Sequence, residues 1–258
     1  MRFFAKKSLG QNFLVSPQAV SDIARAAGIA PGETVVEVGP GTGLLTKALL
    51  EEGARVIAYE KDDRLIPMLK ETFSKEIAEG NLSLIHADIL ETADVPTASY
   101  KVVANIPYYI TGELMRIFFE REAKPSLMVL MVQKEVADRI MSRDGKESIL
   151  SLSVKVYGKP EIIRKVGRGS FRPIPNVDST VIRIGDIASP FDSRDGEKRF
   201  FDIIHGGFAQ KRKKLMRNLE SVASAEKIQE AFRVLGLSEN ARAEELDVED
   251  WKKFVALL

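Results

Sequence analysis

The sequence predicts an α/β protein in which a mostly parallel sheet is covered by helices and is followed by a small all-helical domain. Short apolar runs rich in β-branched residues alternate with helical patterns between residues 34 and 132, as is typical of parallel strands joined by crossover helices. Beyond residue 188 the apolar residues recur only at helical spacing. We therefore predict a sheet domain with an N-terminal arm over residues 1–187, and a helical domain over residues 188–258.

Composition narrows the class of protein. The chain has 258 residues, 45% of them hydrophobic and 29% charged, which is typical of a soluble globular protein. It contains no cysteine and only two histidines, so we expect no disulfide, no metal site and a reducing compartment. The longest apolar run, 127–132, is too short to cross a bilayer. The net charge of +1 means that any nucleic-acid binding must come from a local basic patch.

The N-terminal arm, residues 1–15, mixes basic residues with three phenylalanines. It either docks on the core through its aromatic rings or forms a flap that faces the substrate. Ser16 and Pro17 then give an N-cap and a first helical position, and Gly28 ends the apolar stripe of this helix.

The elements that follow are predicted from periodicity. A glycine loop and a helix from 42 to about 52 come after the first strand, and Pro67 leaves the first turn of the next helix uncertain. The last two strands flank a proline-rich turn, 171–175, and form a hairpin appended to the sheet. Residues 188–196 are the expected linker, and Asp247 caps the final helix. The predicted strands are 34–38, 55–59, 82–86, 101–104, 127–132, 161–166 and 179–184, with helices near 113–119 and 135–141.

The glycine loop contains Gly39, Gly41 and Gly43 directly after a buried strand. Its G-x-G-x-G spacing differs from the G-x-G-x-x-G of dinucleotide sites, where a helix N-terminus faces a pyrophosphate. Glu37, just before the loop, would repel a diphosphate and attract a cation. The loop therefore favours an adenosine ligand without phosphates, although a simple turn or a nicotinamide site remains an alternative.

Three polar residues close successive strands: Glu60, Asp88 and Asn105. A carboxylate at the position of Glu60 can accept hydrogen bonds from two ribose hydroxyls, and Asp88 is placed to accept one from an adenine amine. Each acid alone is better explained as a solvated loop residue or a helix cap. Their joint placement at strand ends predicts a ligand site.

The segment from Asn105 to Tyr108 carries specific chemistry, although it could also be a strand end followed by a rigid turn. The amine of adenine is a poor nucleophile because its lone pair is delocalised into the ring. The Asn105 oxygen and a backbone carbonyl held by Pro107 could bind both amine hydrogens and direct the lone pair at a sulfonium methyl group. Tyr108 could stack on the extruded base.

These residues resemble the S-adenosylmethionine-dependent rRNA adenine N6-methyltransferases. Residues 9–14, 171–179 and 242–246 are similar to the small-subunit dimethyladenosine transferase family, and the resemblance spans nearly the whole chain. It implies a Rossmann-like methyltransferase fold with a seven-stranded sheet and an rRNA-binding helical domain. It also implies dimethylation of two adjacent adenosines in a hairpin loop near the 3′ end of 16S rRNA, during 30S assembly in the cytoplasm, by a monomer.

The resemblance also implies residue roles. The target amine would be oriented by Asn105, Ile106 and Pro107, between Tyr108 and Phe171. S-adenosylmethionine would be held by Gln11, Asn12, Leu14, Glu37, Gly39, Gly41, Glu60, Lys61, Asp88, Ile89 and Asn105.

A basic cluster lies in the helical domain and could be either a solvated helix face or an rRNA phosphate contact. It consists of Lys211, Arg212, Lys213, Lys214 and Arg217.

Two other functions stay open. The large-subunit adenine methylases share the glycine loop and the Asn-x-Pro-Tyr element, and a non-catalytic assembly or transcription factor could keep the fold.

Overall fold

The computed structural model describes residues 6, 10–92, 95–106 and 108–258. The strands are β1 (Phe13–Leu14), β2 (Thr34–Val38), β3 (Arg55–Glu60), β4 (Leu82–His86), β5 (Lys101–Asn105), β6 (Leu127–Gln133), β7 (Lys159–Val166), β8 (Phe171–Arg172) and β9 (Ser179–Gly185). The α-helices are α1 (Pro17–Ala26), α2 (Leu44–Glu51), α3 (Ile66–Thr72), α4 (Ser74–Ala78), α5 (Thr111–Glu120), α6 (Lys134–Ile140), α7 (Ile149–Lys155), α8 (Arg194–Gly207), α9 (Leu215–Leu219), α10 (Ala225–Leu235) and α11 (Val248–Leu257).

The main sheet has seven strands in the order β4-β3-β2-β5-β6-β9-β7, which confirms the predicted seven-stranded, mostly parallel sheet. Strands β2 to β6 are parallel, and β9 pairs antiparallel with both β6 and β7. The predicted late hairpin is present, but its second strand lies inside the sheet. Burial explains this order, because β9 is buried at nearly every position whereas β7 alternates exposed and half-buried residues, as suits an edge strand.

The N-terminal arm makes a second, two-stranded sheet that the sequence did not predict. In it β1 pairs antiparallel with β8, so Phe13 lies opposite Arg172 and Leu14 opposite Phe171. The amide of Val15 also donates a hydrogen bond of 2.8 Å to the carbonyl of Ser170. The arm is therefore docked from residue 13 onward.

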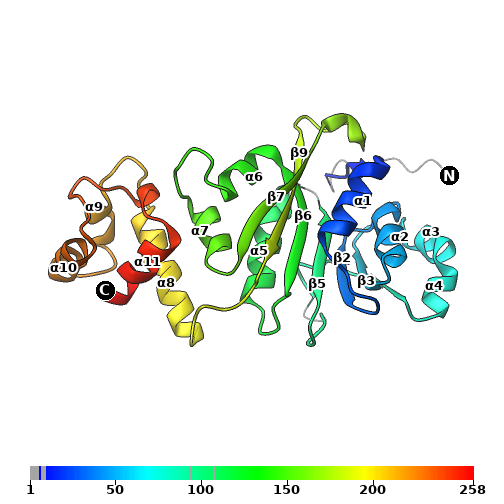
Figure 1. The fold of residues 1–258 in the computed structure, drawn as a ribbon, viewed down its shortest axis with the longest axis horizontal. Coiled ribbons are helices and arrows are strands. Elements are labelled where there is room, and N and C mark those ends of the chain that lie inside the picture. The colour runs from blue at the N-terminus through cyan, green and yellow to red at the C-terminus, as the bar shows by residue number, and fades with distance from the viewer. Residues whose placement is uncertain (1–5, 7–9, 93–94, 107) are drawn as a thin grey trace. The chain divides into compact units, whose positions relative to one another are not determined.

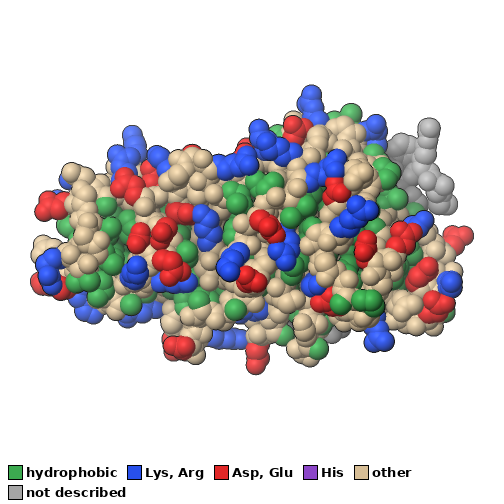
Figure 2. All heavy atoms as spheres, in the orientation of Figure 1, with side chains coloured by type: hydrophobic (Ala, Val, Ile, Leu, Met, Phe, Trp, Pro, Cys, Tyr) green, Lys and Arg blue, Asp and Glu red, His purple; other side chains and the backbone are tan. Residues whose placement is uncertain are grey.

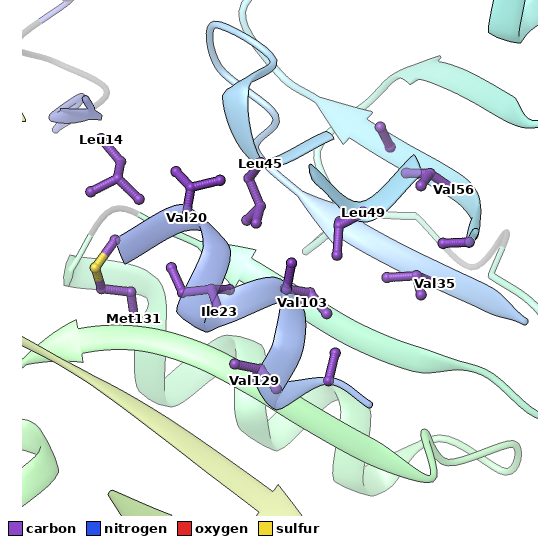
Figure 3. Close-up of a cluster of buried hydrophobic side chains, with 14 of the residues drawn as sticks. Leu14, Val20, Ile23, Val35, Leu45, Leu49, Val56, Val103, Val129 and Met131 are labelled. Carbon is purple, nitrogen blue, oxygen red and sulfur yellow. The ribbon is translucent and has the colours of Figure 1, made fainter. Parts of the chain in front are cut away.

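Helix α1 covers the centre of the sheet (Figure 1). As predicted, Ser16 is its N-cap and accepts a hydrogen bond from the amide of Ala19, with Pro17 in the first turn. Its buried stripe includes Val20 and Ile23. Figure 3 shows these side chains meeting apolar residues from the sheet and from α2. The labelled sheet and α2 residues in this cluster are Val35, Leu45, Leu49, Val56, Val103, Val129 and Met131.

Helix α2 begins at Leu44, two residues later than predicted, because Gly43 is its left-handed N-cap with φ +84°. A Cβ atom on Gly43 would lie 2.6 Å from Cε2 of Phe73. Only glycine fits this position, and the helix therefore starts after the loop. Pro67 lies in the first turn of α3, where its missing amide hydrogen costs no hydrogen bond.

The chain divides into two compact units. The first contains residues 1–137 and 158–188, and the second contains residues 138–157 and 189–258. The sequence pattern placed residues 138–157 in the sheet domain, whereas the structure clusters them with the C-terminal helices. Within the second unit, Lys146 forms an ion pair of 2.7 Å with Glu244, and this pair links the two segments of that unit.

The predicted linker, residues 188–196, extends three residues into the helix that follows it. Helix α8 begins at Arg194, and the hydroxyl of its N-cap, Ser193, accepts a hydrogen bond from the amide of Gly196. The predicted helices follow, and Asp247 caps α11 by accepting from the amide of Asp250. Trp251 is fully buried in this unit. On the face shown in Figure 2, basic and acidic side chains are interspersed, in keeping with the net charge of +1.

Candidate functional site

A pocket opens at the carboxyl ends of the parallel strands, where ligands bind in open α/β sheets. Strands β2, β3, β4 and β5 all end at it, and the arm closes one side. Most of the predicted site residues are brought together here. Those that line the pocket are Gln11, Asn12, Leu14, Gly39, Gly41, Glu60, Lys61, Asp88, Ile89, Asn105 and Ile106.

Two of the predicted catalytic and cofactor residues whose side chains the structure describes do not line it. Phe171 is 1% exposed, because its place in β8 opposite Leu14 turns it into the core. The expectation that Phe171 faces the target base is therefore not met in this arrangement. Glu37 is fully buried in β2. Pro107 and the side chain of Tyr108 lie outside the described residues.

The glycine loop presents backbone to the pocket. Gly39 and Gly41 have φ of +70° and +59°, a conformation that side chains with a Cβ rarely adopt. The amide of Gly41 donates a hydrogen bond of 3.1 Å to Oε2 of Glu60. The loop and the end of β3 are thus joined directly, and a ligand held by Glu60 must lie against the glycines.

Glu60 is 5% exposed, and burial raises the pKa of its carboxyl group. The amides of Gly41 and Asp62 oppose this rise by donating to its two oxygens. A carboxylate offers about four lone-pair positions, so both oxygens can still accept hydrogen bonds from ligand hydroxyls. This geometry fits the predicted contact with a ribose.

Asp88 follows β4 and is paired with Lys61 of the neighbouring strand end. This contact raises the pKa of the Lys61 ammonium group. The other oxygen of Asp88, Oδ1, accepts a hydrogen bond of 3.0 Å from the amide of Leu90. Asp88 is thereby held at the pocket wall by a direct cationic partner and a backbone amide, which fits an acceptor for an adenine amine.

Glu37 lies behind the glycine loop. Neither of its carboxylate oxygens has a hydrogen-bond partner among the residues that the structure describes. Burial raises the pKa of Glu37 to about 8; the neighbouring Thr46 opposes this rise, and the negative charge of Glu60 adds a smaller contribution to it. The raised pKa favours the neutral form of Glu37 in the ligand-free protein, and its predicted attraction for a cationic ligand stays a prediction.

Sequence reasoning missed Asp62, which is 2% exposed and comes two residues after Glu60. It accepts hydrogen bonds from the side chains of Gln11 and Arg64. The contact with Arg64 lowers the pKa of Asp62 well below its usual range. Its position as a charged residue next to a strand end could have indicated Asp62 from the sequence. Its partner Gln11 could not be predicted in this way, because it lies 51 residues away in the chain.

The pocket mouth has an apolar rim that was also missed. Tyr109 is 66% exposed and lines the pocket together with Leu44, which is 45% exposed. Asn105, at the end of β5, lines the same pocket. Tyr109 directly follows the Asn-x-Pro-Tyr segment, and the presence of this second tyrosine could have indicated from the sequence that it belongs to the site. An exposed aromatic ring beside a polar acceptor suits a planar base.

The basic cluster lies in the second unit, where Lys211–Lys214 occupy the turn between α8 and α9 and are exposed. The buried side chain of Asn218 holds this turn by donating hydrogen bonds to the carbonyls of Gly207 and Gln210, at 2.6 and 3.1 Å. Arg217, in α9, forms an exposed ion pair of 3.5 Å with Glu220. The cluster is thus a shaped turn rather than one helix face.

Metal-binding and membrane-spanning features are absent from the part of the chain that the structure describes. Among those residues, no three or more His, Asp or Glu side chains are grouped so as to hold a metal ion. Within the same ranges, no helix has the length and apolarity that crossing a membrane requires.

Comparison with known proteins assigns the family. Residues 2–258 match the family described as "Ribosomal RNA adenine dimethylase". A relative from Dehalococcoides mccartyi, named ribosomal RNA small subunit methyltransferase A, is 41% identical, with 96% of this chain and 86% of the relative covered. A relative of the same name from Geobacillus thermodenitrificans is 36% identical, with 96% and 89% covered.

Solved structures of rRNA methyltransferases support the same family assignment. The 23S rRNA methyltransferase ErmE superposes with a TM-score of 0.78 at 28% identity, with 96% of this chain and 99% of that chain covered. A dimethyladenosine transferase from Plasmodium falciparum has a TM-score of 0.78 at 27% identity, with 94% and 95% covered. The chain therefore belongs to the ribosomal RNA adenine dimethylase family, and its predicted methyltransferase activity and cofactor, S-adenosylmethionine, are confirmed with that assignment.

Proposed function

We propose that this chain dimethylates N6 of two adjacent adenosines in a hairpin loop near the 3′ end of 16S rRNA, within the assembling 30S subunit. The observation that carries the proposal is the placement of Asn105 in the same pocket as Glu60 and Asp88. An amine-orienting amide and two carboxylates suited to an adenosine cofactor then share one cavity. The relatives named for the small subunit, at 36–42% identity, favour that rRNA as substrate.

The pocket fits the cofactor on its own chemistry. The open space beside Gly39, where a Cβ would meet nothing within 4 Å, leaves room for a ligand against the backbone. Glu60 would hold the ribose hydroxyls, and Asp88 with Ile89 would hold the adenine. Gln11, Asn12 and Leu14 of the arm would cover the other side. When bound, S-adenosylmethionine supplies an electrophilic methyl group.

The role of Asn105 is to orient the target amine. Its side-chain oxygen and a neighbouring backbone carbonyl, which we expect Pro107 to hold in place, would accept the two amine hydrogens and direct the nitrogen lone pair into the pocket. The exposed ring of Tyr109 at the rim offers a surface for the extruded base. Positioning and electrostatics carry this reaction. The amine becomes cationic on methylation and releases its proton to solvent.

The basic turn supplies a contact for the rRNA backbone. Lys211–Lys214 are exposed on a turn that Asn218 holds in shape. Phosphates contacted there would position the rRNA without reading its sequence. Arg217 would exchange its partner Glu220 for a phosphate. We place the enzyme in the cytoplasm, where the assembling subunit that we propose as its substrate is found, and propose that it acts as a monomer.

The test is to incubate the protein with labelled S-adenosylmethionine and unmodified small subunits, with large subunits as the parallel sample, and to map the labelled nucleotides. We expect label only on two neighbouring adenosines near the 3′ end of 16S rRNA. Label on large-subunit rRNA would replace the substrate with the one named for ErmE. Binding without label would favour a non-catalytic assembly factor.

A further inference from the structure

Asp62 is a buried carboxylate that the reaction proposed above does not use. It lies just beyond the end of β3 and is 2% exposed. A buried charge is costly unless it is paired and hydrogen-bonded. Its contacts therefore show what it holds in place.

Asp62 contacts both sides of the cofactor pocket. Its backbone amide donates a hydrogen bond of 2.8 Å to Oε1 of Glu60. Its Oδ2 accepts a hydrogen bond of 2.8 Å from Nε2 of Gln11, in the arm. One residue thus connects the wall formed by β3 to the wall formed by the arm.

Arg64 keeps this carboxylate in its charged form. Its Nε lies 2.8 Å from Oδ1 of Asp62, and its terminal nitrogen lies 2.5 Å from Oδ2. This two-point contact fixes the plane of the carboxylate, so Oδ2 faces Gln11. The Gln11 amide is itself oriented, because its Oε1 accepts a hydrogen bond of 2.8 Å from the amide of Lys6.

The contact with Gln11 matters because of where the arm is otherwise attached. Residues 13–15 are held by pairing with β8 and by the bond from Val15 to Ser170. Residues 10–12 extend beyond that pairing and line the pocket. The bond from Gln11 to Asp62 fixes this extension to the end of β3.

We propose that Asp62 is a positioning residue for the cofactor: by fixing Gln11 and Glu60 in one arrangement, it holds both walls of the pocket ready for binding. The proposal rests on the proposed function in one respect, namely that Glu60 and the arm contact the cofactor. Asp62 itself need not touch the ligand.

A reversal of the hydrogen bond tests the link. Gln11→Glu alone brings two carboxylates together, so we expect the affinity for S-adenosylmethionine to fall at least tenfold. Adding Asp62→Asn supplies an amide donor to the new carboxylate but removes the Oδ2 acceptor of the Arg64 terminal nitrogen, so we expect affinity at least threefold above that of Gln11→Glu and still below wild type. The bond from the Lys6 amide can persist in both variants. Calorimetric titration of the full chain with S-adenosylmethionine and with S-adenosylhomocysteine measures the affinities.

A second measurement is independent of the cofactor. Limited proteolysis of the ligand-free protein should cut the arm before β1 faster in Gln11→Glu than in wild type, and more slowly again in the double variant. Steady-state kinetics should show a raised KM for the cofactor with kcat within about twofold of wild type. Asp63→Asn, which removes an exposed neighbouring charge, is the matched control and should leave all three measurements unchanged.

The outcomes separate the link from the proposed function. If Gln11→Glu and the double variant bind equally weakly, or if the rate of cleavage in the arm is the same in all variants, Asp62 does not position the arm. Glu60→Gln provides the comparison, because it removes one acceptor of the pocket itself. If Glu60→Gln binds S-adenosylmethionine weakly and Gln11→Glu binds it normally, only the proposed role of the Gln11–Asp62 bond is wrong. If Glu60→Gln binds it normally, the proposed role of Glu60 is wrong.

Discussion

The ring of Phe13 packs directly against Gly41: a Cβ atom at Gly41 would lie 3.1 Å from Cδ1 and 3.3 Å from Cε1 of that ring. The arm and the glycine loop therefore touch where the pocket is formed. Gly39, two residues earlier, has a similar left-handed φ, but a Cβ there would meet nothing within 4 Å. The two glycines therefore have similar backbone conformations but different surroundings, because only Gly41 has the Phe13 ring next to it.

This pair gives the first prediction. Gly39→Ala should cost only the strain of a left-handed alanine, about 1–2 kcal/mol, and Gly41→Ala should cost that strain and the displacement of Phe13. We therefore expect Gly41→Ala to have the lower melting temperature, measured by calorimetry. In a Phe13→Ala background the two should differ little. Equal melting temperatures in the wild-type background would show that the ring moves freely.

The second prediction concerns Glu37 and pH. Its pKa is raised to about 8 in the folded protein from an ordinary value near 4.5, so between these values the folded state binds a proton that the unfolded state lacks. The free energy of unfolding should therefore fall with rising pH in this window, by up to about 1.4 kcal/mol per unit. Glu37→Gln, which is neutral throughout, should remove this slope in denaturant titrations from pH 6 to 8.

Glu33→Gln is the control for that experiment. Glu33 is paired with Lys101 at 2.7 Å, and the hydrogen bonds of Lys101 and of the Ala30 amide lower its pKa despite partial burial. Its stabilisation is lost only as the pH falls through its lowered folded pKa. Between pH 6 and 8, Glu33→Gln should therefore shift stability by a constant amount. If Glu37→Gln keeps the wild-type slope, Glu37 is ionised in the folded protein.

The third prediction separates binding from chemistry. Asn105→Ala removes the proposed acceptor for the target amine but leaves the contacts made by the glycine loop and Glu60. We expect methyl transfer at saturating cofactor to fall by roughly 10²–10³-fold, while the affinity for rRNA stays within about threefold. Single-turnover transfer and filter binding measure the two. The control is Asn81→Ala at an exposed position before β4, and undiminished transfer by Asn105→Ala would remove Asn105 from the mechanism.

The fourth prediction concerns the basic turn. Lys211→Gln with Arg212→Gln should weaken rRNA association. The slope of log affinity against log salt should also become shallower, by about 0.7–0.9 for each phosphate that the turn no longer neutralises. The comparison is Arg233→Gln with Lys252→Gln, which removes the same charge from ion-paired surface positions in the same unit. Equal salt slopes for the two double variants would show that the turn binds no phosphate.

Local patterns in the sequence determined the strands and the ligand side of the sheet. Buried β-branched runs such as β2 need no distant partner to be recognised, because alternation and length are local properties. The glycine loop, Glu60, Asp88 and Asn105 each follow a strand, and the carboxyl ends of parallel strands meet at one edge. Their assembly into one pocket was therefore predictable, and the structure brings all of them to it.

The tertiary structure decided what depends on distant pairing. The position of β9 between β6 and β7 and the pairing of β1 with β8 follow from burial that no single segment encodes. That pairing turns Phe171 into the core, and the fold buries Glu37 without a partner among the described residues. The bond from Gln11 to Asp62 joins residues 51 positions apart. A sequence states which groups are present, but only the folded chain brings distant groups close enough to share a hydrogen bond.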